Sequence, residues 1–206
     1  MRLETAVEKQ QATSLDFLFF GIAGLISGFG VWFAWPGYWP PSLTLPVPTG
    51  LQTANVSLIP PLAFVLTMGV AVFLTGTASR LEQSLLMWIA AAAATVGIYI
   101  LVVALLFAGY FSQLFGLTGN LTWINFALCG VIGAGLVGLI VGTLAGVMAN
   151  RLFAAMLICG AVSGLGFLVL SFLEVQGRLS LIFVWPWWQT SMGLLIGLWF
   201  SQPGEE

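Results

Sequence analysis

Histidine is absent from this 206-residue chain, and charged residues make up only 6% of it. Histidine is the commonest general base and metal ligand in proteins, and a usual axial ligand of haem. With five Lys or Arg and seven Asp or Glu in total, the chain has few groups for acid–base catalysis or metal binding. We therefore expect a protein that is not an enzyme and that has no metal or other cofactor.

Cysteine is also scarce, because the chain has only two, Cys129 and Cys159. They lie 30 residues apart on different apolar stretches, without the Cys-x-x-Cys spacing of zinc sites and thioredoxin-like pairs. We expect both to be small, buried helix residues. The formal net charge of −2 and the lack of a basic run also argue against a nucleic-acid partner, which requires clustered Lys and Arg.

Apolar residues, in contrast, are abundant. They make up 60% of the chain, and the mean hydropathy of +1.07 lies far above that of a water-soluble domain. A helix needs about 20 mostly apolar residues to cross about 30 Å of hydrocarbon. Six stretches meet this requirement, at residues 17–35, 58–78, 84–110, 124–148, 152–173 and 179–200. The sequence therefore predicts an all-α, polytopic integral membrane protein: a polar N-terminal tail, residues 1–16, and a single six-helix transmembrane domain, residues 17–206.

The charged residues are confined to the tails and to the gaps between these stretches. The gaps hold Arg80, Glu82, Arg151, Glu174 and Arg178, and no Asp, Glu, Lys or Arg lies inside a stretch. A charge at the centre of a membrane helix costs at least about 2.5 kcal/mol, and proteins keep one there for ion pathways, proton relays or voltage sensing. The sequence therefore disfavours these functions.

The positive charges also predict the orientation in the membrane. Arg2, Lys9, Arg80 and Arg151 fall on one side of the predicted bundle, whereas only Arg178 falls on the other. Because short cytoplasmic segments carry the excess of Lys and Arg, we expect both termini to be cytoplasmic. The bacterial cytoplasmic membrane is the favoured location.

Pro186 leaves two geometries open for the sixth helix. Either a full helix begins near residue 179 and kinks at Pro186, or residues 177–184 lie along the membrane interface and a shorter helix begins at Trp185. Both geometries keep six crossings.

The strongest motif is a glycine zipper, a row of small residues four positions apart in the fourth stretch. Its members are Gly130, Ala134, Gly138, Gly142 and Gly146, and the fifth stretch offers a matching face at Gly160 and Gly164. Such a face lets another helix backbone approach closely, which replaces the hydrophobic driving force that is missing in lipid. The motif predicts close packing, either with another helix of this chain or with a partner subunit.

Tryptophan is concentrated on the predicted non-cytoplasmic side. Seven residues fall there: Trp32, Trp35, Trp39, Trp123, Trp185, Trp187 and Trp188. Interfacial rings anchor helices at both membrane surfaces, so this imbalance exceeds what anchoring requires. A charge-free, Pro- and Trp-rich loop, residues 36–57, belongs to the same side. The possible ligand or lipid site consists of Trp35, Trp39, Trp185, Trp187, Trp188 and Gln189, because large aromatic faces and hydrogen-bonding groups coincide there.

Two functions fit these features. The first is a non-catalytic subunit that packs against partner proteins of a larger membrane complex and stabilises them. The alternative is a small transporter or substrate-capture component that binds a small solute or lipid at the Trp-rich site. The expected partners are the lipid bilayer and other integral membrane subunits.

Overall fold

The computed structural model describes residues 16–30, 42–46, 53–81, 83–107, 122–172 and 178–201. The described helices are the N-terminal helix (Asp16–Gly30), α2 (Ile59–Leu74), α3 (Thr77–Arg80), α4 (Leu85–Phe107), α6 (Thr122–Ala145), α7 (Asn150–Phe172) and α8 (Arg178–Phe200). Two strands, β1 (Ser42–Pro46) and β2 (Thr53–Ser57), complete the described part.

Each of the six apolar stretches contains one long helix, so the predicted positions of the helices agree with the structure. Among the described residues, two helical segments are long and apolar enough to cross a membrane: Leu85–Leu106 in α4 and Trp123–Ala145 in α6. Their mean hydropathies are 2.5 and 2.3. The described apolar parts of the N-terminal helix, α2 and α7 are shorter, at 10–17 residues. The length and composition of these segments in α4 and α6 therefore suggest a membrane location.

A hairpin lies between the first two long helices, where the sequence predicts only a loop. β1 and β2 pair antiparallel, with Ser42 opposite Ser57 and Pro46 opposite Thr53. Both strands contain β-branched residues, Thr44 in β1 and Thr53 and Val56 in β2, a residue type that is enriched in strands. Pro46 lacks an amide hydrogen and stands at the strand end, where the loss of a ladder hydrogen bond is tolerated. The described part of the chain is thus helical apart from this hairpin, which was not predicted from the sequence.

The sixth helix follows the first of the two predicted geometries. α8 begins at Arg178 and continues through Pro186 to Phe200. A proline inside a helix removes one backbone hydrogen bond, and close packing against a neighbouring helix helps to retain the helix there. Pro186 has such a neighbour, because it is buried against Gly28 of the N-terminal helix.

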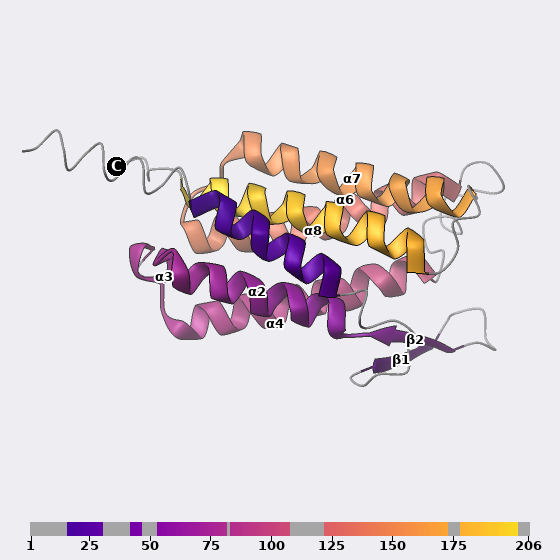
Figure 1. The fold of residues 1–206 in the computed structure, drawn as a ribbon, viewed down its shortest axis with the longest axis horizontal. Helices are drawn as coiled ribbons and strands as arrows, with labels where there is room; N and C mark the ends of the chain where they lie inside the picture. Colours follow the sequence, from indigo (N-terminus) through magenta and orange to yellow (C-terminus); the bar gives the residue numbers. More distant parts are fainter. Residues whose placement is uncertain are drawn as a thin grey trace, which may run out of the picture.

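The long helices run roughly along the long axis of the molecule (Figure 1). The start of the N-terminal helix, the end of α8 and the short helix α3 lie at one end, and the hairpin lies at the other (Figure 1). α6 packs against α7 and α4, and α7 also packs against α8. α8 is central, because the N-terminal helix covers another of its sides.

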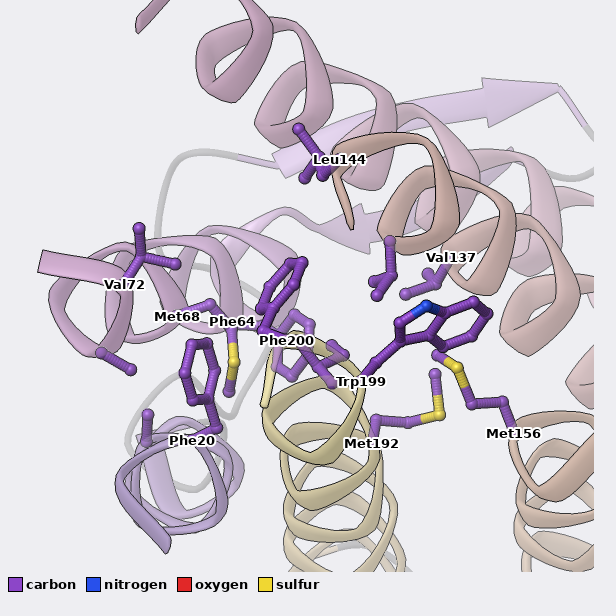
Figure 2. Packing of buried hydrophobic residues seen from close by; sticks show 14 of the residues in the cluster. Phe20, Phe64, Met68, Val72, Val137, Leu144, Met156, Met192, Trp199 and Phe200 are labelled. Atoms are coloured by element: carbon purple, nitrogen blue, oxygen red, sulfur yellow. The ribbon is translucent and has the colours of Figure 1, made fainter. Parts of the chain in front are cut away.

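The core is formed by large apolar side chains from several helices. Trp199 of α8 has Met156 and Met192 beside its indole ring (Figure 2). Phe20 of the N-terminal helix packs on Phe200, with ring centroids 5.8 Å apart. Trp199 also donates a hydrogen bond from Nε1 to the carbonyl oxygen of Val147, 3.0 Å away. This bond connects the end of α8 to the turn between α6 and α7.

The outer surface of the bundle is apolar as well. Large apolar side chains are exposed on every long helix, among them Ile22 on the N-terminal helix, Phe73 on α2, Leu86 on α4, Leu139 on α6, Ile158 on α7 and Leu198 on α8. Water-soluble monomers rarely expose contiguous apolar surface over all their elements. The helices are therefore apolar on both their inner and outer faces.

Candidate functional sites

The glycine zipper of α6 faces α7 over its first half. A Cβ atom added to Gly130 would overlap the carbonyl oxygen of Gly160, and one added to Gly160 would overlap that of Gly130. Gly164 stands against the carbonyl oxygen of Phe126 in the same way. Ala134 is completely buried in this seam. The two backbones therefore touch, which is possible because no side chain separates them.

The second half of the zipper meets side chains rather than backbone. Gly138 faces Phe153 and Met156, and Gly142 faces Met148 and Trp199. Gly146 comes after the last residue of α6 and has a φ of 71°. Its role is to end the helix in the left-handed conformation that glycine adopts without steric cost. Of the zipper's two predicted uses, the structure displays packing within the chain.

A second glycine seam joins the N-terminal helix to α8. Gly24 lies against the backbone of Gln189 and Thr190, and Gly193 lies against the carbonyl oxygen of Phe20. Gly197 faces Phe17 along the same line. The sequence analysis did not single out Gly193 and Gly197, although their spacing of four residues is itself a small-x-x-x-small signal. The first seam involves α7 and the second involves α8, and packing of α7 against α8 joins the two helix pairs.

One buried polar pair lies in this second seam. The hydroxyl of Ser27 donates to the side-chain oxygen Oε1 of Gln189 at 2.6 Å, and the carbonyl oxygen of Gly24 is 2.8 Å from the same hydroxyl. Both side chains are 1% exposed. Gln189 was predicted to contact a ligand, but its amide is directed to the N-terminal helix instead. This bond is the kind of interhelical contact that specifies which helix faces meet.

The two residues after Gln189 point elsewhere. Ser191 is half-buried. Thr190 Oγ1 is buried and has no hydrogen-bond partner among the described residues. Because consecutive helix residues point about 100° apart, Gln189, Thr190 and Ser191 lie on different faces of α8.

The described tryptophans of the predicted ligand site separate into packed and exposed rings. Trp185 contacts Tyr99 of α4 and also Trp188, with ring centroids 5.8 and 5.7 Å apart. Trp188 in turn contacts Phe64 of α2 at 6.1 Å. Trp187 points outward and is 60% exposed. Trp35 and Trp39 lie outside the described residues, so the six-residue site stays a prediction.

Metal ligation has no visible basis in the part of the chain that the structure describes, where no three His, Cys, Asp or Glu side chains are grouped. An open surface of small residues is present instead on α4. Ala90, Ala93, Ala94 and Gly97 are all exposed, and a Cβ atom added to Gly97 would meet nothing within 4 Å. We call these four residues the α4 small face.

No family model matches the chain, and no curated protein or solved structure matches it either.

Proposed function

We propose that this chain is a non-catalytic integral membrane subunit that crosses the bilayer six times and packs against partner subunits through α4. The observation that carries the proposal is the contrast between the α4 small face, which is open, and the glycines of the α6–α7 and α8 seams, which are occupied within the chain.

Six crossings are supported by the apolar outer faces of all six long helices. Exposed side chains such as Leu66, Leu85 and Ile158 suit hydrocarbon and not water. The described charged residues lie at helix ends: Asp16 begins the N-terminal helix, Arg80 ends α3, Arg151 is the second residue of α7, and Arg178 begins α8. This placement avoids the cost of charge at membrane depth.

Cytoplasmic termini, in a bacterial cytoplasmic membrane, form part of the proposal. The first residue of the N-terminal helix and the last residue of α8 lie at the same end of the bundle as α3 (Figure 1). Arg80 of α3 and Arg151 near the start of α7 belong to this end as well. An end that gathers these positive charges suits the cytoplasmic side, where Lys and Arg are in excess.

The partner is inferred to be another membrane helix. In lipid, helices associate where small residues allow close van der Waals packing, and the α4 small face offers four such residues. Within the most apolar 18-residue window of Leu85–Leu106, no residue is buried by the described part of the chain. A partner helix would provide the packing that α4 lacks.

The alternative, capture of a small solute or lipid near the tryptophans, has less support. Gln189 is committed to Ser27, and Trp185 and Trp188 are packed on other rings. Trp187 remains the exposed ring of the described set. Such a site would depend on residues beyond the described ranges.

The proposal is tested by extracting the full chain from its native membrane into polymer nanodiscs and identifying co-purifying molecules by mass spectrometry. We expect stoichiometric integral membrane partners with the unmodified chain, and a loss of at least about tenfold with Gly97→Leu. Gly69→Leu on α2 is the matched control, because Gly69 is also exposed with nothing within 4 Å of an added Cβ atom. Partners that remain with Gly97→Leu, or a chain that purifies alone, would contradict the subunit role. A lone chain that retains one solute would support the capture alternative.

A further inference from the structure

An apolar groove of about 230 Å³ lies between the N-terminal helix and α2. Its rim is formed by exposed side chains, including Ile22, Ile26, Leu66 and Val70. Its floor contains Ala23 and Ala71, which are 8% and 2% exposed. The groove is thus about one side chain deep and opens on the outer surface of the bundle.

The groove offers no free hydrogen-bond donor to an occupant. Thr67 is the polar residue in its lining. The Thr67 hydroxyl lies 2.9 Å from the carbonyl oxygen of Ala63 and 3.1 Å from that of Phe64, so its hydrogen is committed to its own helix. A polar solute, a headgroup or an unpaired peptide group would therefore lose its hydrogen bonds on entering. The occupant must be apolar.

The length and shape of the groove distinguish an acyl chain from a partner helix. On α2 the lining runs from Leu66 to Leu74, and at about 1.5 Å per residue this is about 12 Å. One leaflet is about 15 Å of hydrocarbon, half of the bilayer's total. A helix about 10 Å wide approaches over small residues, but here the small residues lie beneath a rim of larger side chains. A methylene chain fits between such side chains.

The position of the groove selects one leaflet. Its lining comes from Phe19 to Ile26 in the middle of the N-terminal helix and from Leu66 to Leu74 in the second half of α2. Both segments lie toward the end of the bundle that holds Asp16 and α3 (Figure 1). The rim continues without a charged residue into the exposed side chains of Leu18 and Phe73, which we assign to the lipid-facing surface.

We propose that this groove binds one acyl chain of a phospholipid from the leaflet at the Asp16 end of the bundle. The proposal rests on the membrane placement argued under the proposed function, but not on the partner at α4. A lipid tail gains no hydrophobic energy by moving from the bilayer into the groove. Van der Waals contact with the two helices would therefore hold the acyl chain in place. The bound chain fills a space that would otherwise leave the side chains of both helices without neighbours.

The test uses the full chain in nanodiscs of phosphatidylcholine that carries a diazirine at the middle of one acyl chain. After illumination, adducts are mapped by peptide mass spectrometry. We expect at least about threefold more adducts on Ile22, Ile26, Leu66 and Val70 than on Ile158 and Val162, which are comparably exposed on α7. Equal labelling of both faces, or a groove that is unlabelled because a second copy fills it, would overturn the proposal.

Two variants make the test specific. Val70→Phe fills the groove and is expected to lower its adducts at least about threefold, whereas Val162→Phe, at a valine that is 50% exposed compared with 57% for Val70, leaves them unchanged. Leu66→Phe replaces Val70→Phe if the latter does not fold. An unchanged adduct pattern in the filled groove would refute the acyl-chain site. Absence of adducts on every helix would instead refute the membrane placement itself.

Discussion

The hydroxyl of Ser27 lies 2.6 Å from the side-chain oxygen of Gln189, 162 residues further along the chain. This bond joins the first long helix to the last at a point where both side chains are buried. Because the backbones also touch at Gly24, the polar pair fixes the register between two helices that glycines bring together. The contact is therefore a direct test of the helix arrangement.

We expect Ser27→Ala to be more destabilising than Gln189→Met. Ser27→Ala removes the donor and leaves the buried Gln189 amide without its partner, whereas Gln189→Met leaves Ser27 with the carbonyl oxygen of Gly24 at 2.8 Å. The expected loss for Ser27→Ala is about 1 kcal/mol of unfolding free energy, and the coupling in the double variant is about 0.6 kcal/mol. Both free energies are measured by thermal or denaturant unfolding in detergent micelles.

Ser79→Ala is the matched control for this pair. Ser79 is exposed, and its hydroxyl bonds within its own turn to the carbonyl oxygen of Gly76 at 2.8 Å. We expect a change within about 0.5 kcal/mol. Equal losses for Ser27→Ala and Ser79→Ala would show that the N-terminal helix does not meet α8 in this register.

Glycines in the seams and on the α4 small face should respond oppositely to alanine. Gly130→Ala and Gly160→Ala each place a methyl group against the opposing backbone, which must separate. We expect each to cost about 1–3 kcal/mol. Gly97→Ala meets no neighbour and should stabilise by about 0.5–1 kcal/mol through the higher helix propensity of alanine. Melting temperatures in the same detergent provide the comparison, and stable Gly130→Ala protein would argue against backbone contact between α6 and α7.

Trp199 should matter for stability and Trp187 should not. Trp199→Phe removes the hydrogen bond to Val147 and part of a side chain that is 1% exposed. We expect a loss of about 2 kcal/mol, from the missing bond and the space left behind. Trp187→Phe, at an exposed position, should change the unfolding free energy by less than about 0.5 kcal/mol. Similar unfolding midpoints for both variants would contradict the central position of Trp199.

The positions of the helices could be predicted because they depend on local composition. Each long apolar stretch became a long helix, whereas the hairpin Ser42–Ser57 was missed because its strands are short and surrounded by prolines. Gly146 shows a second limit. It fits the four-residue spacing of the zipper, but a row of glycines does not reveal where the helix ends, and the structure ends α6 at Ala145.

The sequence also did not reveal how the described residues of the predicted ligand site are oriented. Trp187, Trp188 and Gln189 are consecutive in sequence, but consecutive residues on a helix point about 100° apart. Trp187 therefore faces outward, Trp188 faces Phe64, and Gln189 faces Ser27. Proximity in sequence showed only that these residues lie at the same depth of the bundle.

The sequence by itself determined where the long helices lie, which of their faces are smooth, and that charges stay at their ends. The tertiary structure decided which small-residue faces meet: Gly130 with Gly160, Gly24 with Gln189, and Gly97 with none of the described residues. The physical reason is that these helices are apolar on their inner and outer faces alike. A helix without a polar side carries no signal for its inward direction, so close backbone contacts and one buried hydrogen bond set that direction.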